Sequence, residues 1–535
     1  MGKIQFNSII KIIFLFIILI SPINIFGQEQ ADTVIENEET VYVIREMSFN
    51  IDGRTKPYAL ISNGEFKEGE YINGKTNLDR YLAQRRQLLI NKQLFEEVNV
   101  DYTTGTKEAD GAIPLKLLVY VKDSWNFIIL PYPKYDSNEG FSITLKARDY
   151  NFLGTMSDLK VDLGYSLNDE DRSINFSVES DTPFHAAGLL WNFRFDHFFN
   201  YTFNQPLYYQ NITGLSANLP WGNTNFTAGI NQYLTVNEEN NDEDIEIYGL
   251  DDRYSGTFGS TELFVSWKIP FGFEVGNYGE LSYTPGLSGR VNYPIGSGSL
   301  DEPRKPLATF SHSFGFGKID WIGNYRKGIS AYIDNDYIWY FSREDAPIRI
   351  TFNSDFKFYW ILSKYFGVSF RFNYRQWWQW SSLIDDWIPY YGAADLIRGV
   401  LDNDIRAYNM FSLNLDFPFR LLRFWPSEWF KNDKLKFLNF EMHFSPFTDL
   451  ALFNGPYNKL KDSDNPSSYS TKFSLKDMIN TAGLEIIVFP DFFKSLKIRG
   501  SIGYNLRKIL DDGFSLKWGF FPAWDEIFIG LDHSY

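Results

Sequence analysis

From about residue 125 to its end, the chain repeats long runs in which apolar and polar residues alternate. The clearest run covers residues 366–375, where one face is apolar and the other carries Gly, Ser, Arg and Asn. An alternation with a period of two places successive side chains on opposite faces of a β-strand. The apolar positions of this run are Phe366, Val368, Phe370, Phe372 and Tyr374. The run therefore predicts a strand with one apolar and one polar face.

The chemistry of the two faces favours a membrane β-barrel over a soluble sandwich. The apolar face is built largely of aromatic side chains, and the opposite face is openly charged. A membrane barrel turns apolar side chains toward lipid and polar ones toward its lumen. Gly, Asn, Asp and Pro separate the runs. The pattern predicts an all-β transmembrane barrel of about 16 antiparallel strands over residues 125–535.

The last five runs determine how this barrel would close. They lie at about 409–422, 434–451, 477–490, 495–508 and 525–535. A barrel leaves no free sheet edge when its last strand pairs with its first. We therefore expect a closing seam between roughly 139–152 and 525–535.

Residues 41–124 have a mixed pattern that predicts a small α+β domain ahead of the barrel. Residues 43–51 alternate as in a half-buried strand, with Arg45 as the exception. Residues 78–89 follow helical spacing, and residues 115–121 alternate strictly.

The N-terminus has the pattern of a secretory signal. Two lysines precede an apolar run from Ile12 to Ile20, and Gly27 offers a cleavage point. We expect residues 1–27 to be a signal peptide and residues 28–40 to be an acidic linker. An uncleaved membrane anchor is the alternative, because the longer apolar stretch is close to a spanning length.

The composition of the chain excludes several classes of protein and of functional site. Aromatic residues make up 18% of the chain while its mean hydropathy is -0.28, which is too polar for a helical membrane protein. The net charge of -16 argues against nucleic acid as a partner. The absence of cysteine excludes disulfides, thiolate metal sites and a lipidated cysteine. We expect no metal and no cofactor, and an acidic stretch at 238–252 is interpreted as a solvated loop rather than a calcium site.

One segment between two predicted strands carries an isolated arginine. Its residues are Ile397, Arg398, Gly399 and Val400. On the strands that follow, the alternation points Asp416 and Asp449 into the lumen. Arginine carries five donors in a planar fork and could pair bidentately with both carboxylates. The pattern therefore predicts an ion pair inside the barrel, with the glycine allowing close approach to the wall.

These segments resemble motifs of the outer-membrane insertase and translocase superfamily, represented by BamA, TamA and FhaC. The Arg398 segment is similar to that family's Val/Ile-Arg-Gly-Phe/Tyr loop motif, with Val400 in place of the aromatic residue. Phe447, Asp449 and Ala451 match a strand motif, Phe/Gly-x-Asp-x-Gly, with alanine in place of the last glycine. Asp416 falls where the family carries an inward acid.

Other parts of the chain carry the same resemblance. Residues 41–124 are similar to one POTRA (polypeptide-transport-associated) domain, and residues 148–154 resemble an early hairpin of the family. The final strand resembles the C-terminal β-signal of outer-membrane barrels, with His533 in place of the first aromatic residue. Its matching positions are Ile529, Gly530, His533 and Tyr535.

The resemblance implies protein assembly or transport without covalent chemistry. Family members fold other barrels into the outer membrane or export polypeptides through it, and the seam is thought to open laterally and template a client strand. The implied partners are the lipid bilayer, unfolded outer-membrane or exported client polypeptides, and accessory periplasmic or lipoprotein subunits. The implied location is the outer membrane of a Gram-negative-type bacterium, with the POTRA-like domain in the periplasm. A single such domain departs from the multi-domain housekeeping machine, so a specialised insertase and a secretion pore both fit.

Two other functions remain open from the sequence. A passive porin or adhesin would explain the barrel but not the POTRA-like domain or the loop motif. A lipid-modifying enzyme is suggested by His443-x-Ser445 and by Ser311-His312-Ser313. Nucleophilic catalysis needs Ser and His in hydrogen-bond reach, whereas residues i and i+2 of a strand lie roughly 6–7 Å apart.

Overall fold

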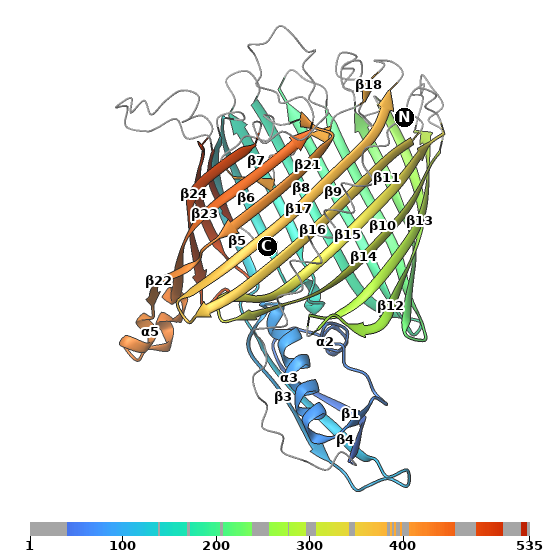
Figure 1. Cartoon of the computed structure of the whole chain (residues 1–535), viewed down its shortest axis with the longest axis vertical. Helices are drawn as coiled ribbons and strands as arrows, with labels where there is room; N and C mark the ends of the chain where they lie inside the picture. Colours follow the sequence, from blue (N-terminus) through green and yellow to red (C-terminus); the bar gives the residue numbers. More distant parts are fainter. Residues whose placement is uncertain are drawn as a thin grey trace.

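The computed structural model shows a β-barrel with a small α+β unit at one end (Figure 1). Secondary structure is described for residues 40–136, 140–167, 172–203, 207–237, 256–276, 278–295, 306–341, 348–381, 386–387, 390–391, 396–398, 406–454, 478–506 and 526–531. The expected signal peptide and nearly all of the expected linker lie outside these ranges. No helix among the described residues is long and apolar enough to cross a membrane.

The barrel wall is a single closed sheet in which chain neighbours pair antiparallel. Its first strands are β5 (Phe127–Asp136), β6 (Gly140–Asp149), β7 (Leu159–Leu167), β8 (Arg172–Ala186), β9 (Leu189–Thr202), β10 (Tyr208–Trp221) and β11 (Thr224–Asn237). The middle strands are β12 (Gly256–Glu274), β13 (Glu280–Pro294), β14 (Leu307–Ile322), β15 (Tyr325–Tyr340), β16 (Ile348–Ser363) and β17 (Phe366–Ser381). The last strands are β21 (Asn409–Asp416), β22 (Phe419–Phe424), β23 (Phe440–Asn454), β24 (Ile479–Pro490), β25 (Ile498–Asn505) and β26 (Glu526–Leu531).

The predicted barrel fold is confirmed, and its described wall has more strands than the alternation suggested. β21 and β22 form one wall strand, because both pair with β17 on one side and β23 on the other. Leaving aside the two-residue β18 (Asp386–Trp387), the described wall has eighteen strands rather than about sixteen. Five wall strands follow the Arg398 segment, as predicted.

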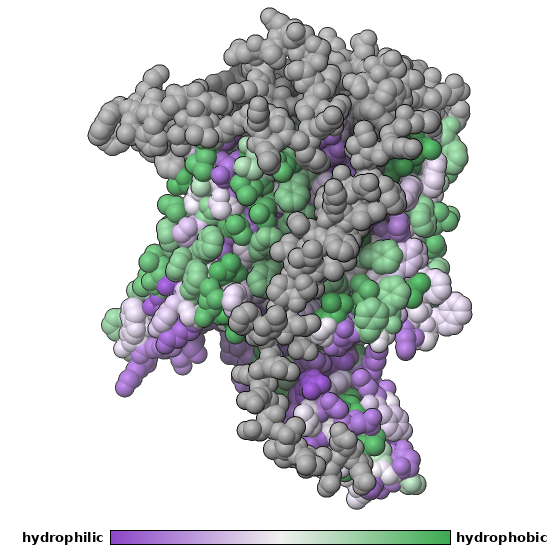
Figure 2. Space-filling model, in the orientation of Figure 1, coloured by the Kyte–Doolittle hydropathy of each residue, from purple (hydrophilic) through white to green (hydrophobic). Residues whose placement is uncertain are grey.

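The two faces of the wall differ as the alternation predicted. Along β23 every second residue from Glu441 to Phe453 is buried, and the residues between them are half-buried. The outer face carries apolar side chains such as Leu263, Leu287 and Trp360. Figure 2 shows apolar residues gathered over the barrel wall, with many hydrophilic residues below on the α+β unit. A period of two in the sequence thus sorts side chains between the lumen and the outside.

The seam lies between β5 and β26, which are neighbours in the closed sheet. The expected seam strand at 139–152 is wrong by one strand, because β6 is flanked by β5 and β7. The missed run, residues 127–136, contains Pro131 and Pro133, and proline inside a run argues against a central strand.

A second correction concerns residues 434–439, which were expected to begin a strand. Residues Asp433–Leu438 instead form a 3-10 helix, and β23 begins at Phe440. The Asn432 side chain accepts a hydrogen bond from the Lys434 N–H, which fixes the helical start.

The α+β unit comprises residues 41–123. Its elements are β1 (Val41–Asp52), α2 (Pro57–Gly64), β2 (Tyr71–Asn73), α3 (Lys75–Asn91), β3 (Phe95–Thr104) and β4 (Ile113–Asp123). The sheet order is β2-β1-β4-β3, with β1 and β4 parallel. The buried face of α3 carries Leu78, Tyr81, Leu82 and Leu89, which pack on alternating residues of β4. Each fully buried leucine contributes about 1.5–3 kcal/mol relative to an exposed one.

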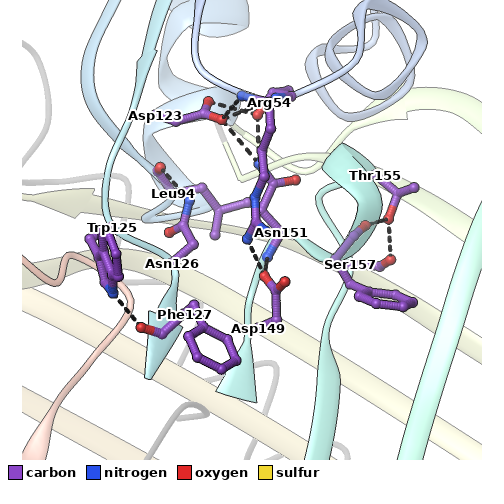
Figure 3. Close-up of polar contacts among 12 residues, drawn as sticks. Arg54, Leu94, Asp123, Trp125, Asn126, Phe127, Asp149, Asn151, Thr155 and Ser157 are labelled. Carbon is purple, nitrogen blue, oxygen red and sulfur yellow. Dashed lines mark hydrogen bonds and ion pairs between the residues drawn. The ribbon is translucent and has the colours of Figure 1, made fainter. Parts of the chain in front are cut away.

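A polar joint connects this unit to the turn between β6 and β7 (Figure 3). Asn151 is fully buried, and its side-chain amide donates to the Thr55 hydroxyl at 2.7 Å and accepts from the Met156 N–H at 2.9 Å. The Asp123 carboxylate accepts from the backbone N–H groups of Arg54 and Thr55. Arg54 also forms an ion pair with Asp149 at the end of β6.

Further contacts hold the unit across the lower end of the barrel. The Asn91 side chain, at the end of α3, donates to Asp320 and accepts from the Trp321 N–H, both at 2.9 Å. On another side, the Tyr58 hydroxyl donates to the Pro183 carbonyl at 3.1 Å. Burial at the joint lowers the pKa of the Lys92 ammonium, and the charge of Asp158 opposes this shift. Anchor points at three separate β-hairpins therefore fix the unit against the barrel.

Candidate functional site

The structure brings Arg398 together with both predicted carboxylates. The Arg398 Nε and Nη2 donate to the two Asp449 carboxylate oxygens at 2.9 and 2.7 Å, and its backbone N–H donates to Asp449 at 2.8 Å. Its Nη1 donates to Asp416 Oδ1 at 2.6 Å. The three side chains come from the loop, β21 and β23, so the loop is tied to two adjacent strands.

The two acids differ in their contacts. Asp449 is fully buried and holds the guanidinium bidentately, whereas Asp416 is 20% exposed and accepts one hydrogen bond from it. The prediction that both acids bind bidentately is therefore wrong for Asp416. The Ser369 hydroxyl donates to the other Asp416 oxygen at 3.2 Å, which orients that carboxylate from β17.

Phe447 supports the arginine from its own strand. The Arg398 guanidinium carbon lies 3.7 Å from the centroid of the Phe447 ring, a cation–π contact. Gly483 on β24 leaves room for that ring, because a Cβ at this position would lie 2.3 Å from Phe447 Cζ. Phe447 of the predicted strand motif thus acts as a platform under the guanidinium.

The backbone preceding Arg398 packs into the wall through apolar contacts. Leu396 and Ile397 are buried with Ala451, and the other members of this cluster are Ala407, Met410, Phe453 and Ile479. The Asn414 side chain on β21 donates to the Leu396 carbonyl at 2.8 Å. A small residue at position 451 therefore gives the loop room to lie against β23.

The sequence reasoning missed two further charged residues of this site. Glu485 on β24 lies 3.6 Å from Arg398 Nη1, and it pairs with Arg499 on β25 at 3.2 Å. All of these groups are largely buried. The alternation of its own strand indicates that residue 485 faces the lumen. Its partners cannot be predicted in this way, because they depend on how the neighbouring strands pair. The ion pair is thus part of a network that extends from β21 to β25.

Some predicted site residues lie outside the described part of the chain. These are Gly399, Val400, His533 and Tyr535. Ile529 and Gly530 are described as backbone of β26, where they pair with Gly500 and Arg499 of β25. The expected acidic loop at 238–252 is also outside the described residues. Within the described ranges, no group of three or more His, Cys, Asp or Glu is arranged to hold a metal ion.

Among the described residues, no hydrogen bond joins His443 to Ser445 or His312 to Ser311. The His443 Nε2 bonds to Glu441 at 2.6 Å, and its ring lies between Tyr325 and Phe489. His312 contacts Asn335 at 3.2 Å among aromatic side chains, and the neighbouring Ser311 lies on the opposite face of the strand. In both cases the imidazole is paired with a group other than the candidate serine.

At the seam, β5 lacks two hydrogen-bond donors. The Tyr150 N–H donates to the Asn126 carbonyl at 2.9 Å just below β5. Antiparallel bonds to one neighbour recur at every second residue, so even-numbered residues of β5 bond to β6 and odd-numbered ones face β26. Pro131 and Pro133 are odd-numbered and carry no N–H. Two positions on the edge of β5 that is turned away from β6 therefore have no backbone donor.

Several solved structures are similar to this chain. BamA from Haemophilus ducreyi lacking POTRA domains 1–3 is 13% identical, with 87% of this chain and 81% of that chain covered and a TM-score of 0.38. CdiB from Acinetobacter baumannii is 14% identical, with 87% and 70% covered and a TM-score of 0.45. CdiB from Escherichia coli is 10% identical, with 95% and 91% covered and a TM-score of 0.39.

The similarity concerns the fold. Neither a family model nor a curated protein sequence matches this chain.

Proposed function

We propose that this protein is an outer-membrane barrel that assists the insertion of outer-membrane proteins or moves polypeptides across the membrane. The seam carries this proposal. Pro131 and Pro133 remove two donors from the β5 edge that faces β26. A missing bond in lipid is not replaced by water, so these positions lower the cost of parting the seam.

A parted seam offers a client a strand edge on which to pair. Carbonyl oxygens of β5 would still accept hydrogen bonds from an incoming strand, while β26 would present its own edge. Main-chain pairing of this kind does not depend on client sequence, which suits a barrel that handles several substrates. A passive porin gains nothing from a weakened seam.

The Arg398 network supports the same function. It ties an inward loop to β21 and β23 and extends to β25, one strand before the seam. Such a network would keep this part of the wall rigid while the seam opens beside it. Residues 396–398, held in the lumen by these contacts, also occupy space that an open porin would leave free.

The α+β unit would receive clients in the periplasm. β2 pairs with Val41–Val43 of β1, and no described strand lies beside Glu46–Asp52 on that edge. An extended client segment can add there as a further strand. On this proposal the unit acts as the POTRA-like domain, and its joint would place the bound segment below the barrel.

Depletion of the protein in its own host, followed by quantitative proteomics of the outer membrane, tests the proposal. Loss of several unrelated barrels is expected for an insertase, and loss of one or two exported proteins is expected for a translocase. Re-expression of the wild-type chain should restore them. An unchanged outer-membrane proteome would contradict both activities and favour the passive porin, adhesin or lipid-modifying alternatives.

A further inference from the structure

The connection between β22 and β23 is a compact projection that the barrel fold does not require. It comprises residues 425–439, here called the foot, and contains α5 (Pro426–Trp429) and the 3-10 helix Asp433–Leu438. Figure 1 shows α5 at the lower left, lateral to the wall and away from the α+β unit. The foot therefore extends outward along the rim of the barrel rather than across its opening.

The foot has a defined internal structure. The Asn439 amide donates to the Ser427 hydroxyl at 2.7 Å, and both residues are buried. The Asn432 N–H donates to the Ser427 carbonyl, and the Asp491 N–H donates to the Asn439 carbonyl at 2.8 Å. These bonds fix both short helices against each other and against the turn after β24. The exposure of the foot's side chains is thus built into its fold.

Large apolar side chains project from the foot. Trp429, Phe430 and Phe437 are 58%, 71% and 57% exposed. This surface continues onto the outer wall, where a β-bulge at Leu421 turns both Leu421 and Leu422 outward. Exposed aromatic side chains rarely cluster on a protein surface that faces water, so this cluster indicates an interaction site.

The foot also concentrates positive charge in an acidic protein. Its exposed lysines are Lys431, Lys434 and Lys436, and Arg423 lies just before it. Two acids accompany them, Glu428 paired with Arg423 and Asp433 paired with Lys436. The chain as a whole carries a net charge of -16. The local excess of cations indicates an anionic partner.

We infer that the foot binds anionic phospholipid at the inner-leaflet surface, with its aromatic side chains among the acyl chains and its lysines on the phosphates. Aromatic residues favour the membrane–water boundary, and long cationic side chains reach from it toward headgroups. Exposed Leu421 and Leu422 of the outer wall lie just before the foot in the chain, and this proximity to the apolar wall favours lipid over a protein partner. The inference rests on the proposed outer-membrane placement.

The full chain can be probed with single thiols, since it contains no cysteine. A water-sensitive fluorophore would be placed on Phe430→Cys in the foot, on Leu263→Cys in the outer wall, and on Ala109→Cys in the α+β unit. Each protein would be refolded into vesicles of phosphatidylethanolamine with phosphatidylglycerol, and into phosphatidylcholine vesicles. Quenching by iodide measures exposure to water.

We expect the labels at 430 and 263 to be quenched several-fold less than the label at 109 in the anionic vesicles. Replacing Lys431, Lys434 and Lys436 by glutamine should raise quenching at 430 toward its value in phosphatidylcholine, with no change at 263. A water-exposed label at 430 beside a shielded label at 263 would overturn the inference and leave the membrane placement standing.

Three other results are also decisive. Exposure at both 430 and 263 would contradict the membrane placement itself. Shielding at 430 that appears only at high protein-to-lipid ratio would identify a second copy, not lipid, as the occupant. Equal shielding in both vesicle types, unaffected by the glutamine substitutions, would overturn the assignment to anionic phospholipid.

Discussion

Arg398 shows how a single side chain can hold a loop inside a barrel. Its guanidinium and backbone N–H reach two carboxylates while its plane rests on Phe447. The contacts are unequal, because Asp449 is fully buried and accepts three of the bonds. Removing one partner of a buried pair leaves the other charge uncompensated, which is more costly than losing a partly exposed contact.

We predict that Asp449→Asn destabilises the folded barrel by about 3–5 kcal/mol and Asp416→Asn by about 1–2 kcal/mol. Urea unfolding of the refolded protein, followed by the gel shift between folded and unfolded forms, measures both. Asp336→Asn, on β15, is the control. Asp336 accepts one hydrogen bond from a hydroxyl group, and the amide oxygen of asparagine can still accept that bond. Equal effects of the Asp449 and Asp416 variants would contradict the unequal roles.

Individual strands differ in how many backbone N–H groups each edge can donate to a neighbouring strand. Pro131 and Pro133 make β5 a poor donor on the side of β26, whereas its other side pairs with β6 along its whole length. Since Pro131 and Pro133 are exposed and lie on the outward face, their effect comes from the missing N–H groups rather than from lumen packing.

Replacing both prolines by valine should strengthen the seam and slow any activity that needs it open. We expect a higher unfolding midpoint and a severalfold lower rate of client-barrel folding in vesicles that contain the variant. Pro285→Val, on β13 far from the seam, is the matched control. If the double valine variant has a higher unfolding midpoint but folds client barrels at the wild-type rate, the seam stays closed during function.

At the scale of the whole molecule, the α+β unit and the barrel share contacts on several turns. The hydrophobic core of the unit continues into Ile128, Tyr150, Met156 and Leu496 of the barrel. Asn151 lies at the centre of the polar joint, and Asn91 holds the opposite side. The unit is therefore held in a set position relative to the seam strand β5.

We predict that Asn151→Ala loosens this joint while the barrel remains folded. Leaving buried polar groups of the joint unpaired costs about 1–3 kcal/mol, so amide exchange in α3 and in the β14–β15 turn should quicken about ten- to hundredfold. Hydrogen–deuterium exchange by mass spectrometry measures this. Asn99→Ala on β3 removes only an exposed hydrogen bond to Glu97 and should leave both regions unchanged. Unchanged exchange in the Asn151 variant would mean that the apolar contacts alone hold the unit.

Part of this organisation follows from local sequence. The alternation in residues 366–375 and 440–454 determines which side chains face the lumen, because a shift of one residue would reverse every face. The inward directions of Asp416 and Asp449 could therefore be predicted from their own strands. The helical spacing of residues 78–89 likewise indicated α3, since its apolar positions recur on one face.

Other features were decided by pairing between distant segments. Glu485 and Arg499 join the Arg398 network, and Gly483 makes room for Phe447, only because β23, β24 and β25 are neighbours in a fixed register. The seam strand was missed because its prolines argue against a strand when only local sequence is considered, whereas in the structure both prolines lie on one side of β5 and its other side pairs fully with β6. Alternation by itself determined the face of each residue. Only the tertiary structure decided its partners, because register and closure depend on strands far apart in the chain.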